Sequence, residues 1–97
     1  MNYCYILYSP KLNRFYTGIC QSDLKERIQK HNDHSYGNHR FTAKTSDWEL
    51  FLSIECKTFA MARRLELHIK KMKSSKYIGN LKRYPELVEK LKNQCKG

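Results

Sequence analysis

The sequence predicts a small α+β domain, in which helices flank a three-stranded antiparallel sheet in the order strand, strand, helix, strand, helix, helix. Its 97 residues suffice for one modest core, so we expect a single domain spanning residues 1–97. Apolar residues make up 40% of the chain, which favours a folded protein over a disordered one. Apolar positions repeat with the period of strands in some segments and of helices in others. A multidomain enzyme, a membrane protein and a collagen-like chain are excluded.

Two strands are predicted first. Residues 3–8 form an uninterrupted apolar and aromatic run, typical of a strand covered on both faces. Residues 9–13, Ser-Pro-Lys-Leu-Asn, are turn formers. Phe15 to Cys20 alternate as a second strand, so the two segments are expected to form a hairpin.

A helix should begin after Asp23, because Asp23 and Glu26 have the spacing of a capping box. This helix places Arg27 and His31 on one stripe beside its apolar face. The stretch from residue 32 to residue 47 is mostly polar and is predicted to be a long loop. We expect Arg40 and Lys44 of this loop to contact nucleic-acid backbone.

The remaining elements are a third strand and two helices. Residues 48–56 alternate between apolar and polar side chains, which predicts the strand. Thr58 can cap a long helix, which Ser74 and Ser75 weaken, and Pro85 can begin a short terminal one. The predicted apolar stripe of the long helix consists of Met61, Leu65, Ile69 and Met72.

The charge of the chain points to a polyanionic partner. Lys and Arg number 19 against 9 Asp and Glu, a formal net charge of +10. Much of this charge lies between residues 57 and 85, where Lys70, Lys73 and Lys76 are candidates for nucleic-acid binding. The four cysteines are widely spaced, which favours reduced thiols and a cytoplasmic location. No membrane span or signal peptide is expected.

Glu66 is the one acidic residue between positions 57 and 85. It has two interpretations. It can pair with Lys70 one helical turn later. Alternatively, it can be a ligand of a divalent cation, since Mg²⁺ often takes one or two protein carboxylates and completes its shell with water and phosphate.

Tyr5 and Tyr16 lie on the two arms of the predicted hairpin, where their rings can meet. Aromatic residues also suit strands, so simple packing is an alternative. Gly18 inside a strand suggests that another group approaches the backbone closely.

Together, these residues resemble the GIY-YIG nuclease superfamily, in particular its small stand-alone branch. The resemblance rests on Tyr3-Cys4-Tyr5, Tyr16-Thr17-Gly18, Arg27 and Glu66, in that order. The chain departs from the first motif at Tyr3 and Cys4, and from the second at Thr17, where the family has Ile. Tyr77-Ile78-Gly79 spells the second motif literally, but it follows a helix and is interpreted as structural.

The resemblance implies hydrolysis of phosphodiester bonds assisted by a single divalent cation, Mg²⁺ or Mn²⁺. It implies that Glu66 binds the cation, that Arg27 faces the scissile phosphate and that both tyrosines line the side of the attacking water. Further polar groups implied at the site are His31 and Asn80. Which group accepts the proton stays open between Tyr5, Tyr16 and His31, because free tyrosine has a pKa near 10 and histidine one near 6.5.

Three hypotheses follow from the sequence. The first is an endonuclease acting on nucleic acid, DNA in preference to RNA. The second is a module of the same fold that binds nucleic acid without cutting it. The third is a domain that acts through protein partners, although no obligate partner is evident.

Overall fold

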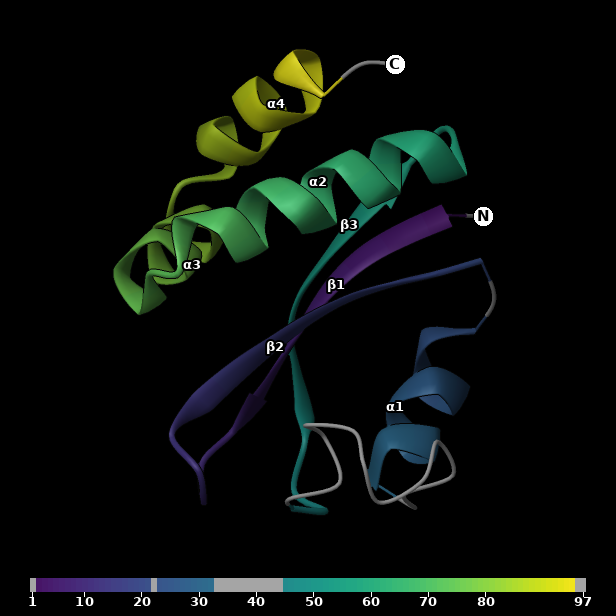
Figure 1. The fold of residues 1–97 in the computed structure, drawn as a ribbon, viewed down its shortest axis with the longest axis vertical. Coiled ribbons are helices and arrows are strands. Elements are labelled where there is room, and N and C mark those ends of the chain that lie inside the picture. The colour runs from purple at the N-terminus through teal and green to yellow at the C-terminus, as the bar shows by residue number, and fades with distance from the viewer. Residues whose placement is uncertain (1, 22, 33–44, 96–97) are drawn as a thin grey trace.

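The computed structural model describes residues 2–21, 23–32 and 45–95. Within these residues the chain forms an antiparallel sheet of three strands in the order β2-β1-β3, with helices on both faces (Figure 1). The predicted α+β class is confirmed. The elements are β1 (Asn2–Ser9), β2 (Arg14–Cys20), α1 (Leu24–Asn32), β3 (Glu49–Cys56), α2 (Phe59–Met72), α3 (Ser75–Arg83) and α4 (Pro85–Gln94).

The predicted hairpin brings the two tyrosine motifs side by side. Tyr5 of β1 pairs with Gly18 of β2, and Leu7 pairs with Tyr16. Asn13 in the connecting turn has a φ of 51°, a left-handed conformation that Asn tolerates. Because neighbouring residues of a strand point to opposite faces, Tyr5, Tyr16 and Gly18 share the face toward α1.

The alternation predicted for the third strand is interrupted. Ile6 pairs with Leu52 and Leu7 with Leu50, so the register skips Phe51. Such a bulge changes which side chains face each side of the sheet. Trp48 therefore packs with Tyr5 in the α1 layer, whereas Ile54 packs on the opposite face.

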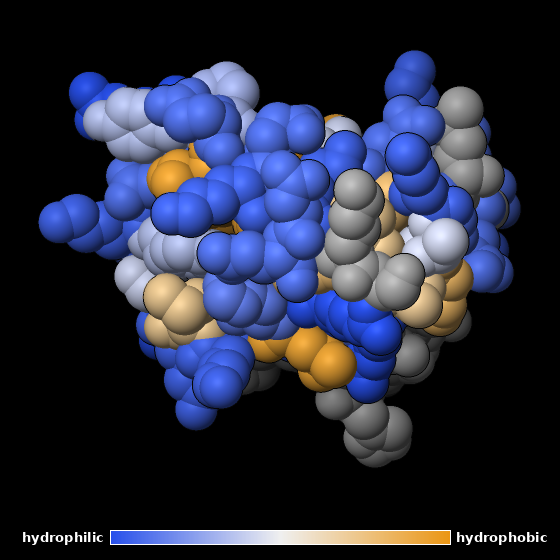
Figure 2. All heavy atoms as spheres, turned by 90° about the horizontal axis from the view of Figure 1, so that it is seen from above, coloured by the Kyte–Doolittle hydropathy of each residue, from blue (hydrophilic) through white to orange (hydrophobic). Residues whose placement is uncertain are grey.

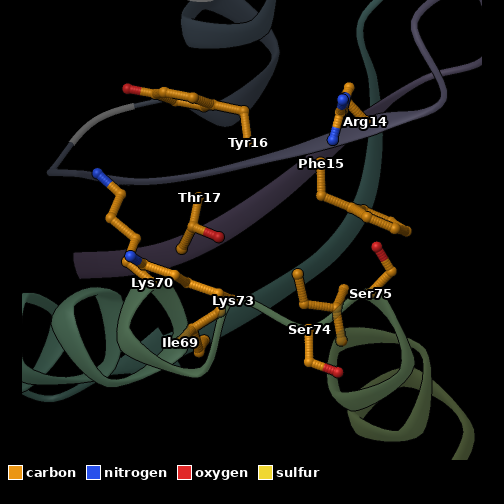
Figure 3. A pocket seen from close by; sticks show the side chains of 10 residues that line it. Arg14, Phe15, Tyr16, Thr17, Ile69, Lys70, Lys73, Ser74 and Ser75 are labelled. Carbon is orange, nitrogen blue, oxygen red and sulfur yellow. The ribbon is translucent and has the colours of Figure 1, made fainter.

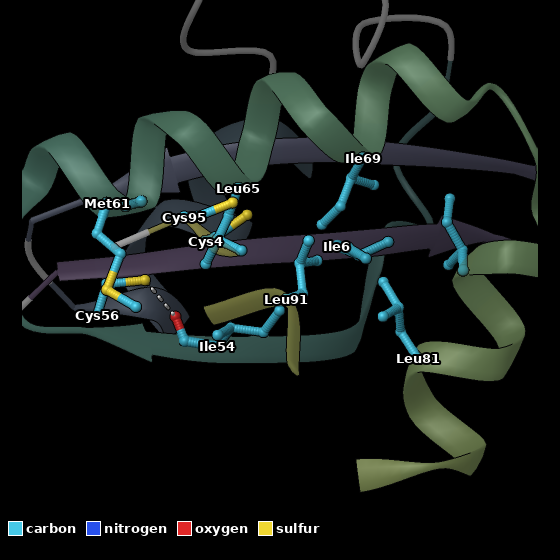
Figure 4. Packing of buried hydrophobic residues seen from close by; sticks show 12 residues of the cluster. Cys4, Ile6, Ile54, Cys56, Met61, Leu65, Ile69, Leu81, Leu91 and Cys95 are labelled. Atoms are coloured by element: carbon cyan, nitrogen blue, oxygen red, sulfur yellow. Dashed lines mark hydrogen bonds between the residues drawn. The ribbon is translucent and has the colours of Figure 1, made fainter. Parts of the chain in front are cut away.

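The sheet separates two hydrophobic layers. On the α1 face, the buried apolar residues are Tyr5, Leu7, Cys20 and Trp48. On the other face, β1 and β3 pack against α2 and α4, and Figure 4 shows this larger core. Its residues include Cys4, Ile6, Ile54, Leu65, Ile69, Leu81 and Leu91. The sheet is thus fixed from both sides, which holds β2 in place at its edge.

The C-terminal part contains three helices, one more than predicted. Thr58 caps α2 as expected, its hydroxyl accepting from the Met61 amide at 3.1 Å. Lys73 then adopts a left-handed conformation, with φ 48°, and Ser74 caps a separate helix, α3. The Ser74 cap begins a new helix where only a weakening was predicted. Met72, placed in the buried stripe by its spacing, is 45% exposed.

All four cysteines are buried, and none forms a disulfide. Burial raises the pKa of the Cys56 and Cys95 thiols, which disfavours the reactive thiolate. Viewed from the end at which α4 lies, the surface is mostly hydrophilic and its apolar areas are small (Figure 2). No helix in the described ranges is long and apolar enough to span a membrane.

Candidate active site

Three of the predicted site residues form one hydrogen-bonded group between the sheet and α1. The Tyr5 hydroxyl lies 2.9 Å from His31 Nε2, and Arg27 Nε donates to the same hydroxyl at 3.4 Å. Tyr5 and His31 are each 1% exposed. Arg27 and His31, which follow Tyr5 by 22 and 26 positions in the sequence, thus meet at its hydroxyl oxygen.

Helix α1 sets the positions of Arg27 and His31. Asp23 accepts from the Lys25 amide at 2.8 Å, which fixes the first turn of the helix. Arg27 and His31 are four residues apart and therefore project from the same face. The Arg27 guanidinium also donates to the Ile19 carbonyl of β2 at 3.3 Å, so it is held at two points.

Burial raises the pKa of the Tyr5 hydroxyl above its ordinary value of 10. The Arg27 hydrogen bond acts in the opposite direction, but desolvation is the larger effect. The phenol is accordingly protonated at neutral pH. Since Arg27 can only donate, the phenolic oxygen accepts from Arg27, and its own proton can be donated to His31.

Gly18 makes this arrangement possible. A Cβ atom at position 18 would lie 2.6 Å from the Tyr5 hydroxyl oxygen and 3.1 Å from Cε2 of Tyr16. The first distance is too short for a non-bonded contact. The close approach expected from a glycine within a strand is therefore that of the Tyr5 ring, with Tyr16 beside it.

Tyr16 connects the buried group to the edge of the sheet. Its ring centroid lies 5.1 Å from that of His31, and it is only partly buried. The Lys70 ammonium of α2 lies 5.6 Å from the centroid of the Tyr16 ring. Lys70 extends past β2 toward this ring (Figure 3). A side chain of α2, on one face of the sheet, therefore approaches the Tyr16 ring around the outer strand.

Glu66 lies one helical turn before Lys70. It is 5% exposed, and its Oε2 accepts from Lys70 Nζ at 3.2 Å. Its Oε1 accepts from Arg63 at 2.5 Å. The predicted pairing with Lys70 is confirmed, and Arg63, three residues before Glu66 on the same helix face, is a second partner that was not predicted. Lys70 thus lies between the carboxylate and Tyr16.

The other predicted residues lie apart from this cluster or beyond the described ranges. Asn80 is on α3, and among the described residues no side-chain hydrogen bond joins it to the cluster. Lys73 lines a cleft with Lys70, and Lys76 is exposed in the first turn of α3. Arg40 and Lys44 lie outside the described residues.

The segment Tyr77-Ile78-Gly79, which has the literal letters of the second motif, lies in helix α3. Tyr77 lies on α3, and its hydroxyl is 3.2 Å from Nε2 of His68. Apart from the backbone of its own helix, no described atom lies within 4 Å of a Cβ built on Gly79, in contrast to Gly18. This geometry confirms that Tyr16-Thr17-Gly18, rather than Tyr77-Ile78-Gly79, adjoins the first tyrosine motif.

These features agree with a comparison against protein families. The family model of the GIY-YIG catalytic domain matches residues 1–79. The chain belongs to this family, and membership implies nuclease-type activity on DNA. Searches of curated proteins and of solved structures found no significant match.

Proposed function

We propose that this domain is an endonuclease that hydrolyses phosphodiester bonds in DNA with the help of a divalent cation. The observation that supports it best is the convergence of Tyr5, Arg27 and His31 on one oxygen, with Tyr16 and Lys70 leading from there to Glu66. A fixed guanidinium and two phenols on the α1 face of the sheet, with a buried carboxylate on α2 across its outer strand, are a suitable set for phosphoryl chemistry.

Arg27 is suited to bind the scissile phosphate. A guanidinium offers planar, paired contacts to phosphate oxygens, and its anchoring to Tyr5 and Ile19 fixes its orientation before the substrate arrives. A charge that is already oriented stabilises the developing negative charge of the transition state without reorganisation.

The two tyrosines have different environments and should have different roles. Tyr5 is buried and stays protonated, so we assign it to positioning Arg27 and His31. Tyr16 is partly buried and lines an open cleft, so we place its hydroxyl on the side of the attacking water. His31 contacts the Tyr16 ring from the buried side and remains a candidate proton acceptor.

We expect a divalent cation to bind through one carboxylate, that of Glu66, in competition with Arg63 and Lys70. The described residues contain no group of three or more His, Cys, Asp or Glu side chains that could enclose a metal ion. Mg²⁺ or Mn²⁺ would therefore be held by Glu66, with water and substrate phosphate as the remaining ligands. Asn80 stays a weaker proposal for a further polar group at the catalytic site. When bound, such a cation would polarise the phosphate oxygens.

One observation favours the alternative, a module that binds nucleic acid without cutting it. Both oxygens of Glu66 are already paired with cations, Arg63 and Lys70. A carboxylate satisfied in this way can have a purely structural role. In either case the proposed location is the cytoplasm, in line with four thiols that form no disulfide.

Plasmid nicking separates the two candidates. We expect the protein to nick supercoiled DNA with Mg²⁺ or Mn²⁺ and not with EDTA. Glu66→Gln and Arg27→Ala should each lower the rate by about 100-fold or more, because each removes a charge placed at the reacting phosphate. DNA affinity, measured by fluorescence anisotropy, should change little for Glu66→Gln.

Glu89→Gln is the matched control, since Glu89 is an exposed acid on α4 and should leave nicking unchanged. If the wild-type protein binds DNA but cuts neither DNA nor RNA with any divalent cation, the binding-module hypothesis replaces the nuclease.

A further inference from the structure

A cleft of about 270 Å³ opens at the outer edge of β2, next to Tyr16. One wall is β2, with Arg14, Tyr16 and Thr17, and the other is the corner where α2 ends and α3 begins (Figure 3). Lys70 and Lys73 belong to this second wall. The cleft therefore continues from Tyr16 away from Glu66, toward the C-terminal end of α2.

The charge of the cleft is of one sign. Its lining includes three basic residues, Arg14, Lys70 and Lys73, and no acidic one. Lys70 is partly compensated by Glu66 at 3.2 Å. Arg14 and Lys73 are exposed and form no ion pair with any described residue. Such a lining attracts an anion and repels a cation.

Thr17 adds an observation that does not depend on surface charge. It is 5% exposed, and its hydroxyl has no hydrogen-bond partner among the described residues. Its side chain projects from β2 toward α2, into the cleft (Figure 3). A buried hydroxyl without a partner is costly, which points to a ligand that supplies one. At this position the family motif has Ile, so the hydroxyl is a feature of this chain.

We propose that the cleft is a second phosphate-binding site, which holds a backbone phosphate of the nucleic acid next to the phosphate that is cut. The inference rests on the proposed function and extends it. Thr17 would donate one hydrogen bond to a phosphate oxygen, and Arg14 and Lys73 would supply the charge. Because Tyr16 borders both the cleft and the catalytic cluster, the two phosphates belong to neighbouring positions of one strand.

The test compares Thr17→Val, which keeps the shape and removes the hydroxyl, with Thr17→Ser, which keeps the hydroxyl. Affinity for a fluorescein-labelled DNA is measured by anisotropy in EDTA, so that cleavage cannot interfere. We expect Thr17→Val to weaken binding about 10- to 100-fold, as for a lost hydrogen bond to a charged group, and Thr17→Ser to stay within about twofold of wild type. Thermal unfolding verifies that both variants are folded.

Amide NMR spectra with inorganic phosphate locate the site without any nucleic acid. The Thr17 and Ser75 amides should shift on phosphate addition, and Lys73→Gln should weaken this response. Lys57→Gln is the matched control, because Lys57 is an exposed lysine just before the N-terminal end of α2.

The outcomes separate this proposal from the nuclease itself. If Thr17→Val weakens DNA binding while wild type cuts nothing, the second site stands and the catalytic role falls. If wild type cuts DNA but Thr17→Val binds as well as wild type and phosphate leaves the Thr17 amide unmoved, the second site is overturned and the nuclease stands.

Discussion

The Tyr5 hydroxyl fits beside β2 because position 18 is a glycine without a side chain. Gly18 faces Tyr5 across the β1–β2 pair, and an added Cβ would be 2.7 Å from Cζ of the ring as well as 2.6 Å from its oxygen. The Tyr5 ring has little freedom to move, because it is buried and its oxygen bonds to Arg27 and His31.

Gly18→Ala should therefore destabilise the protein by about 1–3 kcal/mol, the usual cost of overpacking a core, and should reduce nicking by displacing Tyr5. Urea unfolding measures the first effect and the plasmid assay the second. Gly79→Ala is the control: that glycine lies in α3 with open space around it, so alanine should stabilise by up to about 1 kcal/mol. Equal stability of the two variants would contradict the packing argument.

Arg63 competes with the proposed cation for Glu66. Its side chain is 56% exposed, so the ion pair is screened and its loss should have a modest effect. Arg63→Gln should lower the Mg²⁺ concentration that gives half-maximal nicking by about two- to fivefold, because one competing positive charge is removed. The measurement is a Mg²⁺ titration of the nicking rate.

Arg64→Gln provides the comparison for this titration. Arg64 is the neighbouring exposed arginine and does not pair with Glu66. An unchanged Mg²⁺ requirement in Arg63→Gln would indicate that Glu66 does not bind the cation.

The sequence predicted the chemical types of the site better than its connections. Tyr5, Arg27 and His31 were candidates because of their spacing and the family motif, and the structure brings them into contact. Burial makes Tyr5 a poor base because it raises the pKa of the hydroxyl. This burial results from the packing of α1 against the sheet, which no local sequence pattern predicts. The Thr17 hydroxyl has no hydrogen-bond partner in the part of the chain that the structure describes, and this too depends on how β2 and α2 pack together.

Among the elements, the turn between β1 and β2 is anchored by a residue distant in sequence. The Asp47 carboxylate accepts from the Ser9 hydroxyl at 2.5 Å, the Thr45 hydroxyl at 2.7 Å and the Lys11 amide at 2.9 Å. These hydrogen bonds, that of Ser9 first, lower the pKa of Asp47 from 3.8 to about 2. The ionised carboxylate thus ties the hairpin to the segment before β3.

This anchor predicts a pH dependence of stability. A folded-state pKa below the unfolded one means that the stabilisation is complete above pH 3.8 and is lost as the pH falls toward about 2. Asp47→Asn should therefore be less stable than wild type at neutral pH, and the difference should shrink between pH 4 and pH 2. Urea unfolding of both proteins at several pH values measures it, and a difference independent of pH would refute the assignment.

The strands and α1 could be predicted because their signals are local, namely alternation, turn residues and a cap. Two departures have non-local causes. The bulge at Phe51 changes which side chains face each side of the sheet, so that residues before and after it pack in different hydrophobic layers. Alternation of apolar and polar residues alone cannot predict this change. The break after Met72 places α3 beside α4, and the Ser74 cap is decisive only because Lys73 takes a left-handed conformation.

For the molecule as a whole, the net charge is +10, and part of the basic charge lies where the proposed function needs it. The cleft at the edge of β2 is lined by Arg14, Lys70 and Lys73, and the exposed Lys76 follows in the first turn of α3. The three lining residues share the cleft with Tyr16, so a nucleic-acid strand could follow the edge of β2 into the catalytic cluster. A domain that acts through protein partners would need no such alignment of charge with the catalytic residues.

The salt dependence of DNA binding tests the hypothesis that these basic residues contact phosphates. Neutralising about four to five phosphates releases their counterions, so log Kd for duplex DNA should rise with log salt with a slope of about 4. Lys73→Gln should reduce that slope by about one, whereas Thr17→Val, which changes no charge, should leave it unchanged. Anisotropy titrations between low and physiological salt give the slopes. DNA binding that is insensitive to salt would favour the protein-partner hypothesis, because a basic surface that contacts phosphates must release counterions when it binds.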